Sequence, residues 1–311
     1  MRILVTGGAG FIGSHVVDRY VADGHSVAVV DDLSTGKREQ VNRAAEFHHM
    51  DVLDPRLENV MAAGRFDVVN HHAAQIDVRK SVADPLFDAR VNILGTLRLL
   101  DLSRAHGVKR VVFASSGGAA YGEQVRFPAD EEHPLNPVSP YGVGKVSGEH
   151  YAFYYQAVHG LPYVALRYAN VYGPRQDPHG EAGVVAIFSG RLLTGQPCTI
   201  NGDGGQTRDY VYVGDVVEAN AAAADLSLEV RGPVNIGTGV ETDVNALFAL
   251  LAEVTGSRRA PVHGPAKAGE QQRSVIDPSR AARVLGWRPR TALRDGLRQT
   301  VEFFRTAARG R

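Results

Sequence analysis

Short apolar runs alternate with helical patterns through the first two-thirds of the chain. Six of these runs, several of them rich in valine, predict buried strands. The predicted strands span residues 3–6, 27–31, 46–50, 67–71, 110–115 and 163–168. Strands that alternate with helices in this way are typical of an α/β fold, a parallel, doubly wound (Rossmann) sheet with helices on both faces.

The pattern changes after about residue 172. The later sequence has Gly-Pro pairs, the run Asn201-Gly-Asp-Gly-Gly, short strand patterns at 208–213 and 233–236, and an amphipathic helix near 292–307. These features predict a sheet domain over residues 1–172 and a smaller, mixed C-terminal lobe over residues 173–311. Some of the later chain is expected to cross back to the sheet.

Three glycines follow the first predicted strand. Gly7, Gly10 and Gly13 lie between that strand and an amphipathic helix predicted from Ser14 to Ala22. A strand, a glycine turn and a helix in this order form the phosphate-binding unit of a dinucleotide fold. The first glycine permits the tight turn, the second lets a pyrophosphate approach the helix N-terminus, and the third lets the helix pack against the strand.

An acidic pair, Asp31 and Asp32, ends the second predicted strand. Asp31 lies 18 positions after Gly13, about where a carboxylate binds the ribose hydroxyls of adenosine. Because this carboxylate would repel a 2′-phosphate, the sequence favours NAD over NADP. Lys37 and Arg38 lie close enough to weaken the preference unless they are solvated loop charges.

Tyr141 and Lys145 are four residues apart in Ser-Pro-Tyr-Gly-Val-Gly-Lys. On a helix this spacing places both side chains on one face, and a nearby cation favours the phenolate that can take a proton from an alcohol. Lowering a tyrosine pKa from about 10 to about 7 requires about 4 kcal/mol, which one lysine seldom supplies. A second positive charge is therefore expected, and an oxidised nicotinamide ring would provide it. A tyrosine and a lysine with this spacing are, by themselves, more often two surface side chains. The dinucleotide-binding unit at the N-terminus makes the catalytic interpretation the favoured one.

The composition argues against several classes of partner, against a disulfide and against a metal. The 311 residues include 34 basic and 34 acidic side chains, so neither nucleic acid nor an anionic membrane is an expected partner. No apolar run reaches about 18 residues, and the chain enters a strand at once, so no membrane span or leader is expected. A single cysteine, Cys198, excludes an internal disulfide and favours the cytoplasm. The 12 histidines show no metal-ligand spacing, so no metal is expected.

Taken together, these motifs resemble the extended short-chain dehydrogenase/reductase family. The glycine triplet, Asp31, the serines after the fifth predicted strand and Tyr-x-x-x-Lys occur in the family's order. Within that family the chain is similar to the NAD-dependent nucleotide-sugar epimerases of the UDP-glucose 4-epimerase type. Further matching segments are Val91-Asn-Ile-Leu-Gly-Thr, Ser139-Pro-Tyr-Gly, Leu166-Arg-Tyr-Ala-Asn-Val-Tyr-Gly-Pro-Arg, Arg208-Asp-Tyr-Val-Tyr-Val-Gly-Asp-Val and Asn235-Ile-Gly-Thr-Gly.

The resemblance implies the catalytic roles. Tyr141 would be the acid/base, Lys145 would tune it and bind the nicotinamide ribose, and Ser116 would hydrogen-bond the reacting sugar oxygen. Counting from the fifth strand selects Ser116, whereas counting back from Tyr121 selects Gly117. Because glycine has no side-chain donor, Ser116 is the prediction.

It also implies the binding residues. For NAD these are Gly7, Gly10, Phe11, Ile12, Gly13, Asp31, Asp32, Ser34, Thr35, Gly36, Asp51, Val52, His72, Ala73, Ala74, Gln75, Asn92, Ser115, Tyr141, Lys145 and Tyr168. For a UDP-sugar they are Ser116, Asn170, Arg208, Lys267, Glu270 and Arg273. Arg208 would hold a phosphate as a bidentate fork, and Glu270 would bind the uridine ribose. Lys267 stands where relatives commonly carry a second phosphate-binding arginine, and Arg273 could replace it.

The implied reaction is reversible inversion at C4 of a UDP-hexose, of the UDP-glucose/UDP-galactose type, through a transient 4-keto sugar. UDP-glucuronate and UDP-N-acetylglucosamine 4-epimerases remain alternatives, the latter because the small Ser274 would occupy the family's gate for the C2 substituent. A decarboxylase also stays open. A dehydratase is disfavoured, because Gly117-Gly118 stands where such relatives carry Asp-Glu. A non-catalytic NAD sensor would be expected to lose Tyr141, Lys145 or Ser116.

A homodimer is also implied. Helices around residues 89–104 and 143–158 would form an intermolecular four-helix bundle. The candidate contacts are Leu94, Leu97, Leu99, Leu100, Tyr151, Phe153 and Tyr154. Some of these side chains must instead pack onto the sheet.

Overall fold

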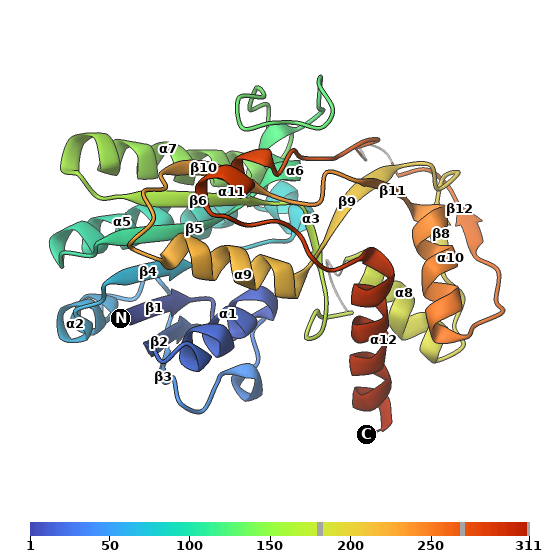
Figure 1. Ribbon diagram of the computed structural model, residues 1–311, viewed down its shortest axis with the longest axis horizontal. Coiled ribbons are helices and arrows are strands. Elements are labelled where there is room, and N and C mark those ends of the chain that lie inside the picture. The colour runs from blue at the N-terminus through green and yellow to red at the C-terminus, as the bar shows by residue number, and fades with distance from the viewer. Residues whose placement is uncertain (179–182, 268–270, 310–311) are drawn as a thin grey trace.

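A parallel sheet of seven strands forms the larger part of the fold, in the order β10-β6-β5-β4-β1-β2-β3 (Figure 1). The computed structural model describes residues 1–178, 183–267 and 271–309. The strands of this sheet are β1 (Arg2–Thr6), β2 (Ser26–Asp31), β3 (Glu46–His49), β4 (Val68–His71), β5 (Arg110–Ser116), β6 (Tyr163–Tyr168) and β10 (Gly232–Ile236). The strand order reverses between β1 and β4, the point at which ligands bind in such sheets. The predicted doubly wound fold is confirmed.

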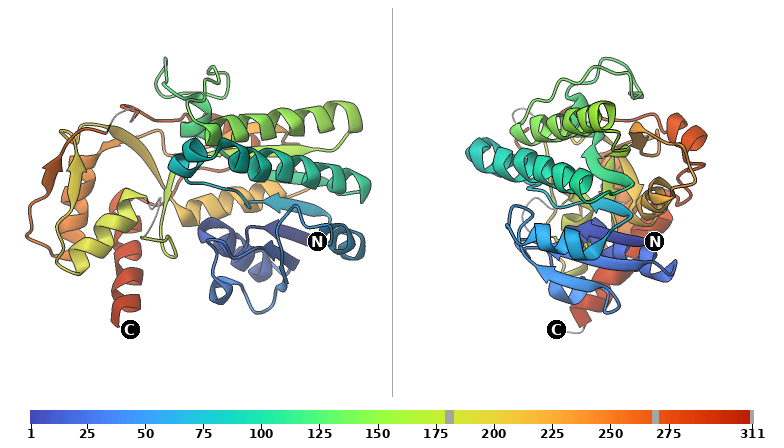
Figure 2. Two further views of the ribbon diagram at one scale, coloured as in Figure 1. Left: turned by 180° about the vertical axis from the view of Figure 1, so that it is seen from behind. Right: turned by 90° about the vertical axis from the view of Figure 1, so that its left-hand side faces the viewer.

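Helices cover both faces of this sheet. The long ones are α1 (Phe11–Ala22), α2 (Leu57–Gly64), α5 (Gly95–Ala105), α7 (Pro140–His159) and α9 (Val213–Ala224). Figure 2 shows α5 and α7 side by side on one face, whereas α1 and α9 pack together on the other. Because both faces are covered, the central strands are apolar on both sides and read as continuous valine-rich runs.

One predicted strand belongs to a different sheet than expected. Residues 233–236 were predicted as part of the smaller lobe, but β10 pairs in parallel with β6, with Val234 opposite Leu166. Val234 and Ile236 are fully buried, because α7 and α11 (Ser279–Val284) both contact β10. The chain therefore leaves the large sheet after β6 and returns to it through α9 and β10.

Short helical segments line the carboxyl ends of the strands. They are the 3-10 helix η1 (Arg38–Gln40), α3 (Val78–Ala83), α4 (Pro85–Ala89), the π-helix η2 (Arg90–Leu94) and α6 (Gly117–Tyr121). The sequence sets where several helices begin. Ser139 caps α7 by accepting a hydrogen bond from the Gly142 N–H at 3.1 Å, and Pro140 occupies its first turn. Tyr141 consequently lies in the first turn of α7.

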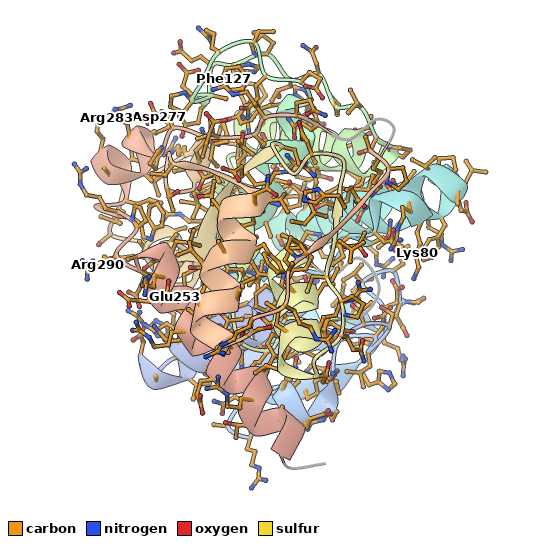
Figure 3. All side chains as sticks on the ribbon, turned by 90° about the vertical axis from the view of Figure 1, so that its right-hand side faces the viewer. Lys80, Phe127, Glu253, Asp277, Arg283 and Arg290 are labelled. Carbon is orange, nitrogen blue, oxygen red and sulfur yellow. The ribbon has the colours of Figure 1, made fainter. Side chains whose placement is uncertain are left out.

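The smaller lobe has its own sheets and core. Its strands are β7 (Asn170–Tyr172), β9 (Thr207–Tyr212) and β11 (Glu241–Asp243) in one mixed sheet, with β8 (Thr199–Asn201) paired to β12 (Val262–Gly264). Its helices are α8 (Val184–Leu193), α10 (Val244–Thr255) and α12 (Leu293–Arg309). Figure 3 shows this lobe end-on, with Glu253 on α10 beside α12. Phe188, Leu247 and Leu297 join the three helices in one buried cluster. Within the described residues, no helix is long and apolar enough to cross a membrane.

A long loop and a late segment of the chain are joined beside the large sheet. The Asn235 side chain donates to the Ala129 carbonyl at 3.0 Å and to the Asp277 carbonyl at 3.2 Å. The Val275 N–H donates to Gln124 Oε1 at 3.1 Å. Asp277 and Phe127, which lie in these two segments, are labelled in Figure 3. Residues from near the end of the chain are thereby placed next to α6.

A buried ion pair joins α7 to the sheet. Arg167 on β6 and Glu149 on α7 approach to 2.6 Å, and both side chains are nearly inaccessible. Ser115 Oγ donates to the same carboxylate at 2.5 Å. Arg167 also donates to the Tyr121 hydroxyl at 3.0 Å, which in turn donates to Asn235 Oδ1 at 2.7 Å. The network connects α7 to β5, β6 and β10.

Replacing Arg167 by methionine should destabilise the protein strongly, because Glu149 would remain as a buried, uncompensated charge. We expect the free energy of unfolding to fall by about 3–5 kcal/mol. Arg294→Met is the matched control. It breaks the ion pair with Glu253, in which both side chains are about half exposed, and should cost no more than about 1 kcal/mol. Urea unfolding measures both, and equal losses would contradict the assigned role of the buried pair.

Candidate active site

The glycine turn after β1 is tightly packed at two positions and open at one. Gly7 has a φ of +70°, and a Cβ there would lie 2.5 Å from the Ala73 amide nitrogen. A Cβ on Gly13 would lie 2.2 Å from the Gly7 carbonyl oxygen. A Cβ on Gly10 would meet only the Gly7 carbonyl oxygen, at 3.2 Å. The space beside Gly10, at the N-terminus of α1, therefore fits a pyrophosphate.

Asp31 is fixed at the end of β2, beside this turn. Its two carboxylate oxygens accept hydrogen bonds from the Ala9 N–H at 2.9 Å and the Leu33 N–H at 2.8 Å. Burial raises the pKa of Asp31, and Gly36 packs so closely that a Cβ would lie 2.8 Å from a carboxylate oxygen. The loop that follows holds three further predicted residues, the exposed Asp32, Ser34 and Thr35.

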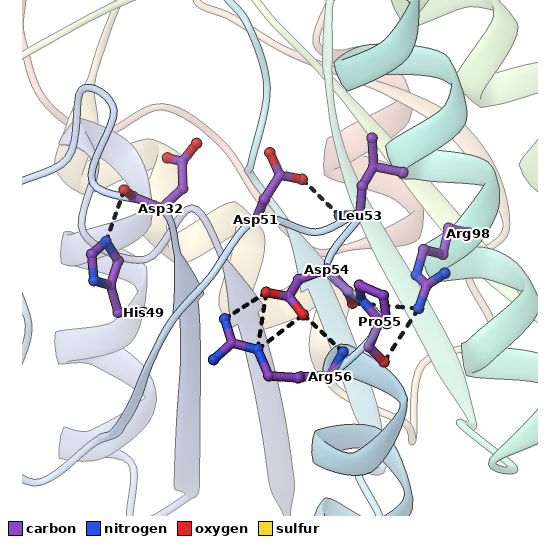
Figure 4. A network of polar contacts seen from close by, with 8 residues as sticks. All are labelled: Asp32, His49, Asp51, Leu53, Asp54, Pro55, Arg56 and Arg98. Carbon is purple, nitrogen blue, oxygen red and sulfur yellow. Dashed lines mark hydrogen bonds and ion pairs between the residues drawn. The ribbon is translucent and has the colours of Figure 1, made fainter.

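Two of the predicted NAD-binding residues, both acidic, follow the neighbouring strands β2 and β3. Figure 4 shows Asp32 after β2 and Asp51 after β3. Asp51 accepts a hydrogen bond from the Leu53 N–H at 2.6 Å, while Val52 is buried in the core. Arg38 is one of the two cations that weaken the predicted preference for NAD. Its guanidinium lies 4.4 Å from the centre of the Phe47 ring.

The loop after β4 is held by buried side chains. Asn92 in η2 accepts a hydrogen bond from the Gln75 N–H at 3.0 Å and donates to the Gln75 carbonyl at 2.9 Å. Burial lowers the pKa of His71 to about 3 and that of His72 to about 4, and the positive charge of Lys145 acts in the same direction. Both imidazoles are therefore neutral near pH 7. His72 stacks on the ring of Tyr168, with 6.3 Å between centroids.

The three predicted catalytic side chains meet at the carboxyl end of β5. Lys145 Nζ donates to the Ala114 carbonyl at 2.8 Å and lies 5.7 Å from the centre of the Tyr141 ring. Ser116 lies close enough to the Tyr141 hydroxyl for its side chain to lower the pKa of that tyrosine. Ser116 also caps α6, where its oxygen accepts a hydrogen bond from the Ala119 N–H at 3.4 Å.

The electrostatics of this group keep Tyr141 protonated in the protein alone. Burial raises the pKa of Tyr141 to about 12; the Ser116 side chain opposes this rise, and the charge of Asp88 adds to it. Burial also lowers the pKa of Lys145 to about 8, against the opposing charges of Asp88 and Glu149. As the sequence argument expected, one lysine does not make this tyrosine a base near pH 7.

Of the two positions considered for the catalytic serine, Ser116 is the one beside Tyr141. A Cβ on Gly117 would lie 3.1 Å from a methyl group of Ile276, so this position faces the late segment. A Cβ on Gly118 would lie 3.3 Å from the Ser274 hydroxyl. The region next to Ser116 is therefore bordered by small residues.

Two of the predicted cofactor residues use their hydroxyls inside the fold. Ser115 donates to Glu149. The Tyr168 hydroxyl donates to Asn220 Oδ1 at 3.1 Å, and both Tyr168 and Asn220 are buried. Any contact of these two residues with NAD must therefore come from their backbone or from the Tyr168 ring.

Apart from Ser116 on β5, the predicted substrate residues that the structure describes lie in the smaller lobe. Asn170 begins β7 and Arg208 lies on β9, where its Nη1 donates to the Thr207 carbonyl at 2.7 Å. Lys267 is exposed and lines a cavity of about 320 Å³ together with Gln206 and other polar residues of this lobe. Glu270 lies outside the described residues.

Arg273 is engaged elsewhere. It forms an ion pair with Glu241 at 2.7 Å, and its guanidinium lies 3.8 Å from the centre of the Phe127 ring. Its planar fork is therefore occupied by a carboxylate. Lys267 and Arg273 both remain predicted candidates for the second phosphate contact.

Three residues that organise the site were not singled out from the sequence. Asp88 lies four positions before Asn92, and Glu149 lies four positions after Lys145, so helical spacing could have pointed to both. Asn220 carried no local signal. It becomes visible only in the fold, where its side chain bonds both Tyr168 and Asn70.

A Rossmann sheet with a glycine turn after β1, and with a serine, a tyrosine and a lysine assembled after β5, defines an enzyme that works with a bound dinucleotide. The model of the NAD dependent epimerase/dehydratase family matches residues 3–237, and the chain belongs to that family. The residues present fit NAD, because the turn is open at Gly10 and Asp31 stands at the end of β2. No group of three or more His, Cys, Asp or Glu side chains in the described ranges could hold a metal ion.

Similar proteins carry a more specific name. A UDP-glucose 4-epimerase of Mycolicibacterium smegmatis is 48% identical over 98% of this chain and 99% of its own length. The crystal structure of Thermotoga maritima UDP-glucose 4-epimerase with UDP-glucose is 50% identical, with a TM-score of 0.97 over 99% of this chain and all of that one. Thermus thermophilus UDP-glucose 4-epimerase in complex with NAD is 47% identical, with a TM-score of 0.93 over the same shares.

Gly10→Ala should weaken NAD binding more than it weakens the fold. The added methyl group would occupy the open space beside the helix N-terminus, and we expect the affinity for NAD to fall at least about tenfold. Gly190→Ala on α8 is the control, because its nearest contact would be an ordinary 3.9 Å. Calorimetric titration of cofactor-stripped protein with NAD, alongside thermal unfolding, separates the two effects. Unchanged affinity in Gly10→Ala would place the pyrophosphate elsewhere.

Proposed function

We propose that this protein is an NAD-dependent 4-epimerase of UDP-hexoses that interconverts UDP-glucose and UDP-galactose through a transient 4-keto sugar. The observation that carries the proposal is the meeting of Ser116, Tyr141 and Lys145 at the edge of the sheet that also carries the dinucleotide turn. The similar proteins named above, at about half identity, support the choice of UDP-glucose.

Tyr141 moves the proton in the proposed mechanism. Bound NAD supplies the chemistry of accepting and returning a hydride, and its oxidised ring is positively charged. Lys145 is held beside Tyr141 by the Ala114 carbonyl, so that two cations would favour the phenolate. The phenolate takes the proton of the C4 hydroxyl, and Ser116, which lies beside Tyr141, orients the sugar oxygen. The same tyrosine returns the proton when the opposite face of the sugar has been reached.

Inversion requires a firmly held diphosphate and room for the sugar to turn. Arg208, whose Nη1 donates to the Thr207 carbonyl, and the exposed Lys267 are the two cations that we assign to the diphosphate. Gly117 and Gly118 add no side chains beside Ser116, and their neighbours there are the buried Ile276 and Ser274. This combination favours epimerisation over a reaction that holds the sugar in one orientation.

The alternative functions have weaker support. UDP-glucuronate and UDP-N-acetylglucosamine 4-epimerases share the first step, but the relatives at about half identity are named for UDP-glucose. A 4,6-dehydratase needs an added acid and base next to Ser116, where this chain has Gly117 and Gly118. A non-catalytic NAD sensor does not account for the assembled Ser116, Tyr141 and Lys145.

The direct test is an epimerisation assay of purified protein without added NAD. UDP-glucose, UDP-N-acetylglucosamine and UDP-glucuronate are supplied separately, and the products are resolved by chromatography. Conversion of UDP-glucose to UDP-galactose is expected. Failure to convert any of the three sugars, even after NAD is added, would refute the proposed function.

Tyr141→Phe should abolish turnover while leaving the cofactor in place. Loss of the phenolic oxygen removes the proton acceptor, and we expect kcat to fall at least about 10³-fold, with NAD affinity within a few-fold of the original. Tyr212→Phe is the matched control, because the Tyr212 hydroxyl donates a hydrogen bond to the Gln299 side chain on α12. An active Tyr141→Phe variant would exclude this tyrosine as the base.

We also propose that the enzyme is a homodimer in the cytoplasm, without nucleic-acid or membrane partners. Cytoplasmic location is supported by Cys198, a buried free thiol. The dimer is supported by apolar side chains left exposed on adjacent helices: Leu86, Leu94, Tyr151, Phe153, Tyr154 and Val158. Of the other predicted contacts, Leu99 and Leu100 are buried against the sheet, and Leu97 packs at the edge of the same core. A four-helix bundle of α5 and α7 from two copies would cover the exposed set.

Phe153→Glu should convert the dimer to a monomer. Phe153 is 58% exposed on α7, so a charge there costs the single chain little but would be buried uncompensated in the bundle. Val125→Glu, at a position 70% exposed on the loop after α6, should leave the dimer intact. Light scattering after size-exclusion chromatography gives both masses, and a Phe153→Glu variant that remains dimeric would remove this surface from consideration.

A further inference from the structure

Asp88 is a buried carboxylate at the candidate site that takes no part in the proton transfer at Tyr141. It lies on α4 and is 1% exposed. Its Oδ1 accepts two hydrogen bonds, from Gln75 Nε2 at 2.9 Å and from Asn92 Nδ2 at 3.0 Å. These amides come from the loop after β4 and from η2. One carboxylate oxygen thus joins three segments around the predicted nicotinamide side of NAD.

The two amide groups also hold one another. Asn92 exchanges two hydrogen bonds with the backbone of Gln75, and Gln75 Nε2 donates to the Asp77 carbonyl at 2.9 Å. The direction in which a buried amide points is decided by the acceptors that its NH₂ group finds. Asp88 Oδ1 is an acceptor shared by both NH₂ groups, and it adds to the backbone bonds that each amide makes with Gln75 or Asp77.

The other oxygen of Asp88 faces the catalytic helix. Oδ2 is buried and has no hydrogen-bond partner among the described residues. A Cβ on Gly144 would lie 3.5 Å from it and 3.0 Å from the Asn92 Cβ. Gly144 lies in the turn that joins Tyr141 to Lys145. The glycine therefore allows this turn to pass close to the carboxylate.

Asp88 is the carboxylate whose charge acts most strongly on Lys145. Lys145 is 5% exposed, and the carboxylates that act on it are Asp88 and Glu149. Glu149 is already bound to Arg167, so that pair adds little net charge. The histidines that face the turn from the end of β4, at positions 71 and 72, are neutral near pH 7. A buried ammonium without a countercharge is strongly unfavourable.

We propose that Asp88 is a positioning residue of this enzyme: one oxygen holds the amides of Gln75 and Asn92, both predicted to bind NAD, and the carboxylate places its charge against the turn of α7 that carries Lys145. The identity of the cofactor and the reaction rests on the proposed function. The charge effect of Asp88 on Lys145 does not depend on which reaction the enzyme catalyses.

Asp88→Asn isolates the charge, because asparagine keeps an oxygen that can accept from both amides. A negative charge favours the protonated form of every group near it, so its removal lowers the pKa values of Lys145 and Tyr141 together. Both limbs of the pH profile of kcat should move to lower pH, by about one unit. Asp295→Asn is the matched control, since Asp295 forms a surface ion pair on α12, and its profile should be unchanged. Unshifted limbs in Asp88→Asn would overturn the role of the charge.

Asp88→Ala removes the shared acceptor as well as the charge. Calorimetric titration of cofactor-stripped protein should show an affinity for NAD about tenfold lower in Asp88→Ala than in Asp88→Asn. This measurement does not depend on turnover. Equal affinities would overturn the positioning of the two amides.

A combined variant keeps the proposal testable if Asp88→Asn fails to fold. In Asp88→Asn/Lys145→Met neither charge is buried, so cooperative urea unfolding should return. A combined variant as unstable as Asp88→Asn would overturn this charge effect. If the protein without any substitution lacks epimerase activity, the proposed function is contradicted. The NAD affinities and urea unfolding of the Asp88 variants still test the role of Asp88.

Discussion

The buried ion pair between Glu149 and Arg167 determines where the catalytic helix lies. Glu149 follows Lys145 by four residues and Tyr141 by eight, so the three side chains share one face of α7. The carboxylate is bound to β5 through Ser115 and to β6 through Arg167. Removing two charges from water is costly, and it is offset here because each charged group also has hydrogen-bond partners in the network. The height and rotation of α7 are thereby set relative to the strands that carry Ser116.

A second constraint is the close approach of backbones at the glycine turn. It fixes the shape of the part of the site that is predicted to bind the cofactor. A chain of hydrogen bonds connects it to the catalytic end. Thr6, at the end of β1, bonds His71 at 2.7 Å; His71 bonds Thr96 at 3.0 Å, and Thr96 donates to the Asn92 carbonyl at 2.7 Å. Asn92 in turn bonds Gln75 and Asp88. The phosphate-binding turn and the surroundings of Tyr141 are thus parts of one buried polar network.

The smaller lobe contributes to the site by a different principle. Its cations, Arg208 and Lys267, are on a short strand and an exposed segment, whereas Ser274 reaches the large sheet because the late segment is hydrogen-bonded to the loop after α6. The cations proposed to bind the diphosphate and the small residue near Ser116 therefore come from separate parts of the chain. A site of this kind suits a sugar that turns while its diphosphate stays in place.

The sequence by itself determined the features that depend on short spacings. Apolar runs specified the first six strands, the glycine triplet specified the turn, and an interval of four residues placed Tyr141 with Lys145, because backbone geometry alone relates residues so close in the chain. The tertiary structure decided which sheet β10 joins, that Arg273 pairs with Glu241, and that Asp88 lies against the turn of α7 between Tyr141 and Lys145. These outcomes depend on which distant surfaces can bury one another and on which charges then lack water. No local pattern carries that information.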